Sequence, residues 1–445
     1  MTGAYESKLD DVYGIAREGV PRTYIPRADV DERFVNEITR DQHIVVYGSS
    51  KQGKSSLLRT VLSDDDYVAI QCAIDWDKVA VYRAILKEIG ISVAETHTQD
   101  RTGTREFKAE VKAEGGVPIF AKASGNGAVG NSRSKSHTTA SRFVEFDPGS
   151  ATDVIRVLQE AGFDRWIVLE DFHYLDPEVQ RKLASDLKTF FERSKISFII
   201  VGVWLEANRL VVYNGDLAGR ITSIPADTWT EDGLRAVILA GEPLLNVKFS
   251  EIVIEELIRE SQQNVGLLQE ACRQMCIARN VFSTAPETVY FEDLAEAETA
   301  YSYVAEQLAA RYANVISQFS EGLRDQELHM YKWIMHSVIS AKHWQRKAGL
   351  KAQDIFRHID LHHPTRRRRL AANNVTAALK NVAKIQHHAK TQPIVFDYDE
   401  AYARLRVVDN QFLLYLASTD KHVALSHLPT FPNEPEAVDT GEPGE

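Results

Sequence analysis

The chain opens with short apolar runs that alternate with segments in which apolar residues recur at helical spacing. Uninterrupted apolar runs predict strands that are covered on both faces, at 43–47, 67–72, 166–169, 196–203 and 221–225. Helical spacing occupies most of the intervals, at 54–62, 79–89, 151–161 and 177–194. This rhythm predicts an α/β fold, a parallel sheet with helices on both faces.

The rest of the chain departs from this rhythm in four places. Within a core assigned to 1–229, residues 97–148 carry a Lys/Glu alternation and a Gly/Ser/Asn-rich run, which predict an inserted β-hairpin with a mobile tip. Helical periodicity throughout 230–320 predicts an all-α lid. Three helices and two strand-like pieces within 321–426 follow the order of a winged helix-turn-helix domain. The Pro-, Glu- and Gly-rich residues 427–445 predict a disordered acidic tail.

Composition restricts the classes of protein to which the chain can belong. Its 445 residues exceed what one core usually supports, so we expect two or three domains. No apolar run approaches the roughly 18 residues of a membrane span, and the start has no basic or aliphatic leader. We therefore expect a cytoplasmic protein with no membrane partner. Cys72, Cys272 and Cys276 are too few for a disulfide framework and are interpreted as buried thiols.

The glycine-rich turn after the first strand carries the most specific chemistry in the chain. It fits G-x-x-x-x-G-K-[ST] and lies between an apolar strand and a helix, as that motif requires. Backbone N–H groups of such a turn bind phosphate oxygens, while Lys54 neutralises the β- and γ-phosphates and the Ser55 hydroxyl coordinates Mg²⁺. The sequence therefore predicts a site for ATP and Mg²⁺. The nucleotide-binding residues predicted here are Gly48, Ser49, Ser50, Lys51, Gln52, Gly53, Lys54, Ser55 and Ser56.

Hydrolysis also needs a carboxylate that holds the metal and a group that orients the attacking water. Glu170 and Asp171 directly follow the apolar run at 166–169, so they should stand at the carboxyl edge of the sheet, beside the phosphates. We assign Glu170 to the metal and Asp171 to the base. The common order of such a pair is Asp then Glu, so the two roles are exchangeable here.

On these motifs the chain resembles the AAA+ and STAND group of P-loop ATPases, in particular the bacterial and archaeal ATPases akin to the origin-recognition initiators. The resemblance covers about residues 20–420. It implies that Ile25, Pro26 and Arg27 help to seat adenine. It also implies that Arg220, just ahead of the strand at 221–225, reaches the γ-phosphate bound by a neighbouring subunit.

The chain departs from that family at two positions. Trp204 stands where the resemblance leads us to expect a polar sensor residue after the strand at 196–203. The motif at 263–267, Gln-Asn-Val-Gly-Leu, has neither the usual sensor arginine nor the Gly-x-Pro of STAND proteins. Both departures favour a switch that hydrolyses ATP slowly.

Charge is distributed unevenly along the chain. The net charge is −11, but residues 341–406 hold 14 Lys and Arg against 5 Asp and Glu, a local +9 that leaves −20 for the remainder. The predicted helix at 375–385 follows a run of four arginines, and in a winged helix the third helix enters the major groove of DNA. The predicted DNA-binding residues are Arg366, Arg367, Arg368, Arg369, Lys380 and Lys384.

Two functions of different classes are consistent with this sequence. The first is an ATPase switch that closes its lid on ATP, forms a homo-oligomer through Arg220 and presents residues 321–426 to double-stranded DNA. The alternative is a signalling or defence-type regulator that binds ATP and uses the same domain to recognise a protein partner.

Overall fold

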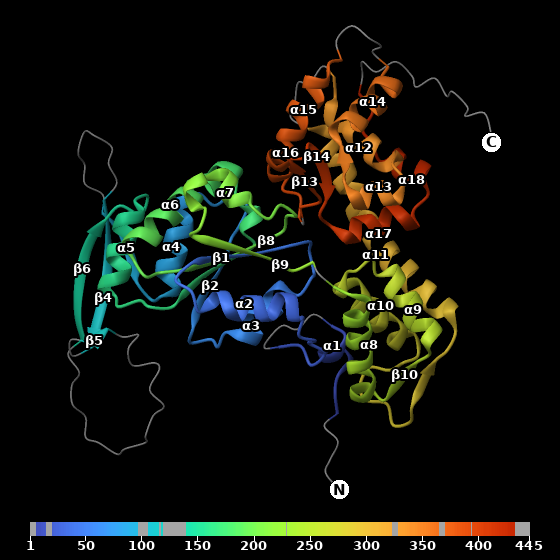
Figure 1. Ribbon diagram of the computed structural model, residues 1–445, viewed down its shortest axis with the longest axis horizontal. Coiled ribbons are helices and arrows are strands. Elements are labelled where there is room, and N and C mark those ends of the chain that lie inside the picture. The colour runs from blue at the N-terminus through green and yellow to red at the C-terminus, as the bar shows by residue number, and fades with distance from the viewer. Residues whose placement is uncertain are drawn as a thin grey trace. The chain divides into compact units, whose positions relative to one another are not determined.

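The computed structural model describes residues 6–14, 20–96, 106–114, 117–118, 139–227, 229–322, 328–364, 370–392 and 394–431 (Figure 1). The chain divides into two compact units. The first consists of Met1–Val247 with two later loops, Gln263–Gly266 and Ser283–Pro286. The second consists of Lys248–Gln262, Leu267–Phe282 and Glu287–Glu445. The predicted boundaries at 229 and 320 do not coincide with this division. Helix α8 (Glu231–Leu245), beyond the boundary at 229, packs against α1 (Leu9–Val12) within the first unit.

The first unit is built on a five-stranded parallel sheet with the order β2-β7-β8-β1-β9. The strands are β1 (His43–Tyr47), β2 (Tyr67–Gln71), β7 (Trp166–Glu170), β8 (Phe198–Gly202) and β9 (Ile221–Pro225). These are the five strands predicted from the apolar runs, with ends that differ by at most two residues. All five residues of β8 are buried, as expected for a central strand covered on both faces.

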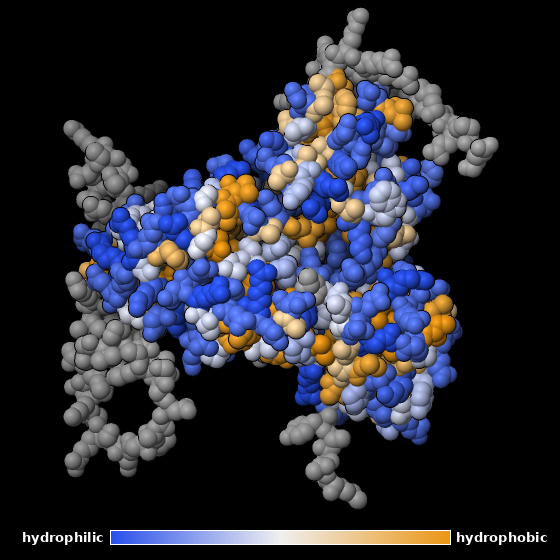
Figure 2. Space-filling model, viewed as in Figure 1, coloured by the Kyte–Doolittle hydropathy of each residue, from blue (hydrophilic) through white to orange (hydrophobic). Residues whose placement is uncertain are grey.

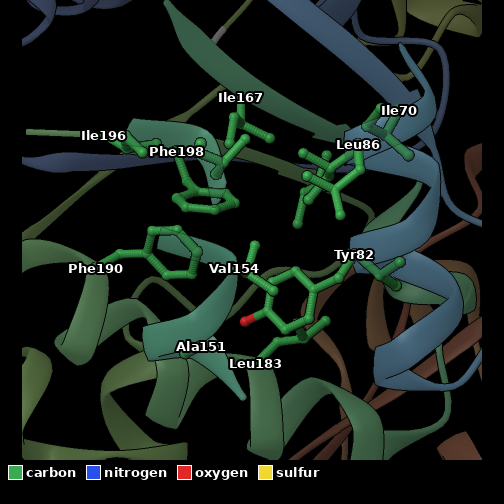
Figure 3. Packing of buried hydrophobic residues seen from close by; sticks show 14 of the residues in the cluster. Ile70, Tyr82, Leu86, Ala151, Val154, Ile167, Leu183, Phe190, Ile196 and Phe198 are labelled. Carbon is green, nitrogen blue, oxygen red and sulfur yellow. The ribbon is translucent and has the colours of Figure 1, made fainter. Parts of the chain in front are cut away.

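Helices cover both faces of this sheet, which confirms the predicted fold class. The helices of the first unit are α1 (Leu9–Val12), α2 (Arg33–Ile38), α3 (Lys54–Val61), α4 (Lys78–Glu88), α5 (Ala151–Glu160), α6 (Pro177–Arg193), α7 (Arg209–Tyr213) and α8 (Glu231–Leu245), with short helical turns η1 (Ala28–Glu32), η3 (Phe172–Tyr174) and η4 (Gly215–Leu217). Side chains of β7 alternate between two cores, with Ile167 on one face and Val168 on the other. Tyr82 of α4 and Phe190 of α6 fill the first core (Figure 3), and Phe34 and Leu57 of α2 and α3 fill the second.

The predicted insertion forms a small antiparallel sheet of its own. Its strands are β3 (Ser92–Thr96), β4 (Glu106–Glu114), β5 (Val117–Pro118) and β6 (Thr139–Phe146). The predicted hairpin is the β4/β6 pair, in which Phe107 lies opposite Phe146 and both side chains are buried. The sequence did not indicate that β3 would extend this sheet. The Gly/Ser-rich tip lies outside the described residues.

Helices dominate the first part of the second unit. They are α9 (Glu251–Glu260), the larger part of α10 (Val265–Ala278) and the 28-residue α11 (Leu294–Glu321). One difference from the predicted all-α lid is a two-stranded sheet of β10 (Val247–Phe249) and β11 (Val289–Phe291). The aromatic rings of Phe249 and Phe291 stack with centroids 4.7 Å apart. The strands were not predicted because three residues are too few to show the alternation of a strand in the sequence.

The C-terminal part combines helices with a three-stranded antiparallel sheet, ordered β12-β14-β13. The elements are α12 (Met330–Ser340), α13 (His343–Ala348), β12 (Leu350–Lys351), α14 (Ala352–His362), α15 (Ala372–Lys380), α16 (Val382–His388), β13 (Phe396–Asp399), β14 (Arg404–Val407), α17 (Asn410–Ser418) and α18 (Lys421–Ser426). The buried Gln386 amide joins α16 to β13, because it accepts from Val395 N at 2.8 Å and donates to the Phe396 carbonyl at 2.7 Å.

Residues 427–431, which were predicted to belong to a disordered tail, are described by the structure. Leu428 packs against the C-terminal core, and the Phe431 ring stacks on His329 with centroids 3.7 Å apart. Residues 432–445 lie outside the described part of the chain. Hydrophilic residues cover most of the face shown in Figure 2, with small scattered hydrophobic groups. Among the described helices, none is both long and apolar enough to cross a membrane.

A buried histidine in the first strand predicts acid sensitivity. The His43 ring is fully buried, with Nε2 2.9 Å from the Leu187 carbonyl and Nδ1 accepting from Phe198 N at 3.1 Å. These partners suit only a neutral ring, and burial lowers its pKa from 6.5 to about 4. Between these pH values the unfolded chain binds a proton that the folded chain does not, so stability falls as the pH falls.

We expect the protonation of His43 to lower the free energy of unfolding by about 2 kcal/mol when the pH falls from 7.5 to 5. Urea unfolding of the parent and of His43→Gln, which keeps a donor and an acceptor, measures this contribution across that range. His388→Gln, at an exposed position, is the matched control. Parallel pH profiles for the parent and His43→Gln would contradict the assignment.

Candidate nucleotide-binding site

The turn between β1 and α3 has the backbone geometry that its glycines permit. Gly53 has a φ of 79°, in the left-handed region, and precedes the first residue of α3. Gly48 has a φ of 148°, and a Cβ there would lie 2.8 Å from an Asp227 carboxylate oxygen. The α3 N-terminus has no side-chain cap, so its first backbone N–H groups face the turn. This arrangement is suited to an anion.

Lys54 projects into this turn and binds its backbone. The ammonium donates to the carbonyl oxygens of Gly48 at 3.0 Å and Ser49 at 2.6 Å. Burial lowers the Lys54 pKa to about 8, against the opposing effect of nearby carboxylates. The lysine is therefore a desolvated cation whose present partners are weak neutral acceptors, which phosphate oxygens can replace.

The predicted carboxylate pair lies beside this turn. Ser55 Oγ donates to Glu170 Oε2 at 3.0 Å, which joins residues that are 115 positions apart. Burial raises the Glu170 pKa, and the neighbouring Asp171 charge raises it further. Asp171 has a φ of 55° and accepts from Gln71 Nε2 at 3.0 Å. The structure thus brings together the Lys54, Ser55 and carboxylate positions predicted from the sequence, whereas their roles stay predictions.

Asp227, which the sequence analysis missed, also contacts this turn. It lies just after β9 and accepts from Ser49 N at 2.7 and 2.9 Å and from Ser49 Oγ at 3.1 Å. Burial raises its pKa, which the Lys54 charge opposes. An acid two residues beyond a predicted parallel strand belongs to the same sheet edge as the P-loop, so this signal was present in the sequence.

Arg27 is the member of the predicted adenine-seating group that reaches the turn. Its Nη1 donates to the Ala226 carbonyl at 2.7 Å and to the Gln52 carbonyl at 3.4 Å. The guanidinium lies 4.6 Å from the centre of the Trp229 ring. Of the other two members, Ile25 is half-buried and Pro26 is exposed.

The motif at 263–266 contacts the outer part of the same turn. Asn264 Nδ2 donates to the Ser50 carbonyl at 3.0 Å, and Gly266 N donates to the Lys51 carbonyl at 3.2 Å. A Cβ at Gly266 would lie 2.6 Å from Lys51 Cβ, so this approach requires glycine. The motif lacks the sensor arginine and the Gly-x-Pro that the resemblance leads us to expect, and no residue pattern in the sequence predicts its contact with the P-loop.

Arg220 lies at the amino-terminal end of β9, whereas the P-loop follows the carboxyl end of the parallel strand β1. Its guanidinium pairs with Glu192 Oε1 at 2.9 Å and also donates to the Asp216 carbonyl. Arg220 and the P-loop of the same chain therefore stand at opposite edges of the sheet. A role toward a neighbouring subunit's nucleotide stays a prediction.

The predicted DNA-binding residues are only partly described. Arg366, Arg367, Arg368 and Arg369 lie outside the described residues. Lys380, the last residue of α15, and Lys384, in α16, are both exposed, and Lys380 Nζ pairs with Glu400 Oε2 at 2.9 Å. Glu400 lies in the turn between β13 and β14, so one predicted contact already has an acidic partner.

The donors around Ser55 fit Mg²⁺. This cation keeps several waters and takes one or two protein oxygens together with substrate phosphates. The Ser55 hydroxyl and the Glu170 carboxylate are such oxygens, and they already lie within hydrogen-bond distance of one another. Within the described ranges no group of three or more His, Cys, Asp or Glu is placed to hold a metal ion.

No protein-family model and no curated protein matches the sequence. Among solved structures, the Walker-type ATPase PABY2304 of Pyrococcus abyssi is similar at a TM-score of 0.50 and 11% identity, over 91% of this chain and 99% of that one. The Orc1 protein of Aeropyrum pernix in complex with DNA aligns at a TM-score of 0.44 and 12% identity, over 96% and 98% of the two chains. Together with the sheet order and the P-loop, the first shows that the chain has the fold of that Walker-type ATPase.

Proposed function

We propose that the protein is an ATP-binding switch that hydrolyses ATP slowly. One observation carries this proposal, the hydrogen bond between Ser55 and Glu170 beside the buried Lys54 cation. Chance would not assemble a phosphate-binding turn, a desolvated cation and a carboxylate at one sheet edge from strands so far apart in sequence. The likeness in fold to a Walker-type ATPase agrees with this interpretation.

The proposed division of labour follows from the contacts of each residue. Lys54 and the α3 N-terminus bind the phosphates, and Ser55 with Glu170 holds Mg²⁺, which supplies charge neutralisation of the phosphate oxygens. Asp171 orients the attacking water and accepts its proton. Gln71 supports this role, because its amide fixes one Asp171 oxygen and so leaves the other for water.

Slow turnover is proposed because the usual sensor groups are replaced by residues that cannot act on a phosphate. Trp204 is fully buried, and a Cβ at Gly202 would overlap its ring, so the indole belongs to the core. The motif at 263–266 contributes amide and backbone donors to the P-loop carbonyls instead of a cation.

We also propose that ATP binding is coupled to homo-oligomerisation through Arg220. The residue stands at the sheet edge opposite its own P-loop, on the surface of the unit, with its side chain 30% exposed. A guanidinium on that edge is available to a neighbouring subunit once it leaves Glu192.

The C-terminal domain is proposed to be a winged helix that binds double-stranded DNA. Helices α12, α14 and α15 with the strand order β12-β14-β13 support this assignment, and α15 and α16 present Lys380 and Lys384 to solvent. The four arginines before α15 would supply phosphate contacts that position the helix.

One observation favours the alternative, a regulator that binds a protein partner. The turn between β13 and β14 carries Glu400, which neutralises Lys380, and Tyr402, which is 73% exposed. A carboxylate on the wing repels DNA phosphates, whereas an exposed tyrosine suits a protein interface.

DNA binding by the full chain distinguishes the two functions. We expect replacement of Arg366, Arg367, Arg368 and Arg369 with Ser to weaken duplex binding for all sequences, because these side chains neutralise phosphates without reading bases. The slope of log affinity against log salt should fall by about one for each phosphate that the protein no longer neutralises.

Glu400→Gln is the matched variant, which should change duplex binding in the opposite direction. Release of Lys380 should strengthen duplex binding and steepen its salt dependence. Fluorescence anisotropy of a labelled duplex between about 50 and 200 mM salt, with ATP and Mg²⁺ present or omitted, measures both variants. If the parent shows no duplex binding at the lowest salt, the DNA function fails and the protein-partner function replaces it.

A further inference from the structure

His173 is a buried polar side chain at the nucleotide site. It lies in η3, directly after the carboxylate pair at the end of β7. The residue is 6% exposed, and within the described residues neither ring nitrogen has a hydrogen-bond partner. Folded proteins pair nearly all of their buried polar groups, because an unpaired one costs stability. Such a group beside a phosphate-binding turn indicates a partner that arrives with the ligand.

The surroundings of His173 favour an anion. Burial lowers its pKa well below the ordinary value, and the charges of Lys54 and Arg209 lower it further. The ring is therefore neutral and has one N–H donor, with two cations close enough to act on it. A phosphate oxygen is the kind of acceptor that such a donor and such charges attract.

The segment that follows β8 packs next to η3. Beyond β8 the chain has Trp204, whose ring packs edge-on against Phe172 with centroids 6.4 Å apart. The turn η3 contacts β8, so His173 and Trp204 belong to the same part of the sheet edge. The Trp204 indole N–H is also buried without a partner among the described residues, but its ring belongs to the hydrophobic core, whereas His173 directly follows the carboxylate pair.

We propose that His173 donates a hydrogen bond to the γ-phosphate of bound ATP. This inference rests on the proposed function and adds to it a residue that distinguishes ATP from ADP. Lys54 binds the carbonyls of Gly48 and Ser49 in the structure, and it leaves them to meet the phosphates. In this proposal an oxygen of the γ-phosphate accepts the hydrogen bond from the unpaired imidazole N–H.

The test compares two nucleotides on two variants of the full chain. His173→Phe keeps a planar ring and removes both nitrogens, whereas His173→Gln restores a donor. Dissociation constants are measured for ADP and for ADPNP, a non-hydrolysable analogue of ATP. We expect His173→Phe to weaken ADPNP about tenfold or more and to leave ADP unchanged, because ADP lacks the terminal phosphate. His173→Gln should recover part of the ADPNP affinity.

Thermal unfolding distinguishes a role in nucleotide binding from a role of His173 in folding alone. Without nucleotide, His173→Phe should unfold at the parent's temperature or above it, because it removes unpaired polar atoms from the interior. With ADPNP its stabilisation should be smaller than the parent's, and with ADP it should be equal. If the phenylalanine variant does not fold, His173→Leu carries the same comparison.

Two results would overturn the inference while the proposed function stands. One is binding of both nucleotides by His173→Phe at the parent's affinities, and the other is an equal loss for ADP and ADPNP. A folded parent that binds neither nucleotide would instead contradict the proposed function, and the inference with it.

Discussion

Lys54→Ala should lower ATP affinity by about 10²-fold or more and leave the fold intact. The substitution removes a buried cation that the structure places at the centre of the phosphate-binding turn. Charge-assisted hydrogen bonds are worth about 1.5–3 kcal/mol each, so the loss of two such bonds to phosphate accounts for this magnitude. The fold should survive because the lysine's present partners are backbone carbonyls of the same turn, and burial already disfavours its charge.

Calorimetric titration with ATP measures the effect, and circular dichroism checks the fold. Arg220→Ala is the matched control, since it removes a cation at the opposite edge of the same sheet. It should lose much less ATP affinity than Lys54→Ala and lose any ATP-dependent increase in mass by light scattering, whereas Lys54→Ala should lose both. Equal ATP affinity in Lys54→Ala and the parent would show that the site has been misassigned.

Asp171→Asn should retain ATP binding and lower the rate of hydrolysis by about 10²-fold or more, the usual scale for loss of a general base. The asparagine keeps the shape and can still accept from Gln71, whose amide binds Asp171 Oδ2 at 3.0 Å. What it loses is the capacity to take a proton from water. Single-turnover hydrolysis at saturating ATP separates this step from binding.

Glu170→Gln provides the internal comparison. The Ser55 contact at 3.0 Å can persist with an amide oxygen, but the metal loses an anionic ligand, so the Mg²⁺ dependence should shift to higher concentration. Should Glu170→Gln abolish hydrolysis at saturating Mg²⁺ while Asp171→Asn spares it, the two roles are exchanged.

The sequence predicted those parts of the fold that are encoded locally. Each strand of the central sheet is a short apolar run between turn residues, and each was assigned to within two residues. The P-loop and the Glu170–Asp171 pair were found because a motif and a strand end place them at one edge.

Most of the missed features are recognised only in the folded structure, although the position of Asp227 just after a predicted strand was a signal in the sequence. Asp227 is 178 positions from Ser49, and Asn264 is 214 positions from Ser50. His173 is recognised as a candidate binding residue only because it is buried without a hydrogen-bond partner among the described residues, and no residue pattern reveals this. Very short strands such as β10 and β12 exist because a partner strand is present, and two or three residues carry no period of their own.

The contact between the motif at 263–266 and the P-loop affects how freely this part of the sequence can vary. Both acceptors, at Ser50 and Lys51, are backbone carbonyls, so the two hydrogen bonds do not require the serine or lysine side chain. Gly266 has no such freedom, because a Cβ would collide with Lys51, and Lys51 is restricted by its φ of 61° in the left-handed region. Mutational tolerance should therefore be higher at Ser50 than at Lys51, and lowest far along the chain at Gly266. A gene fragment that ends before this glycine would encode the nucleotide motif without the segment that braces it.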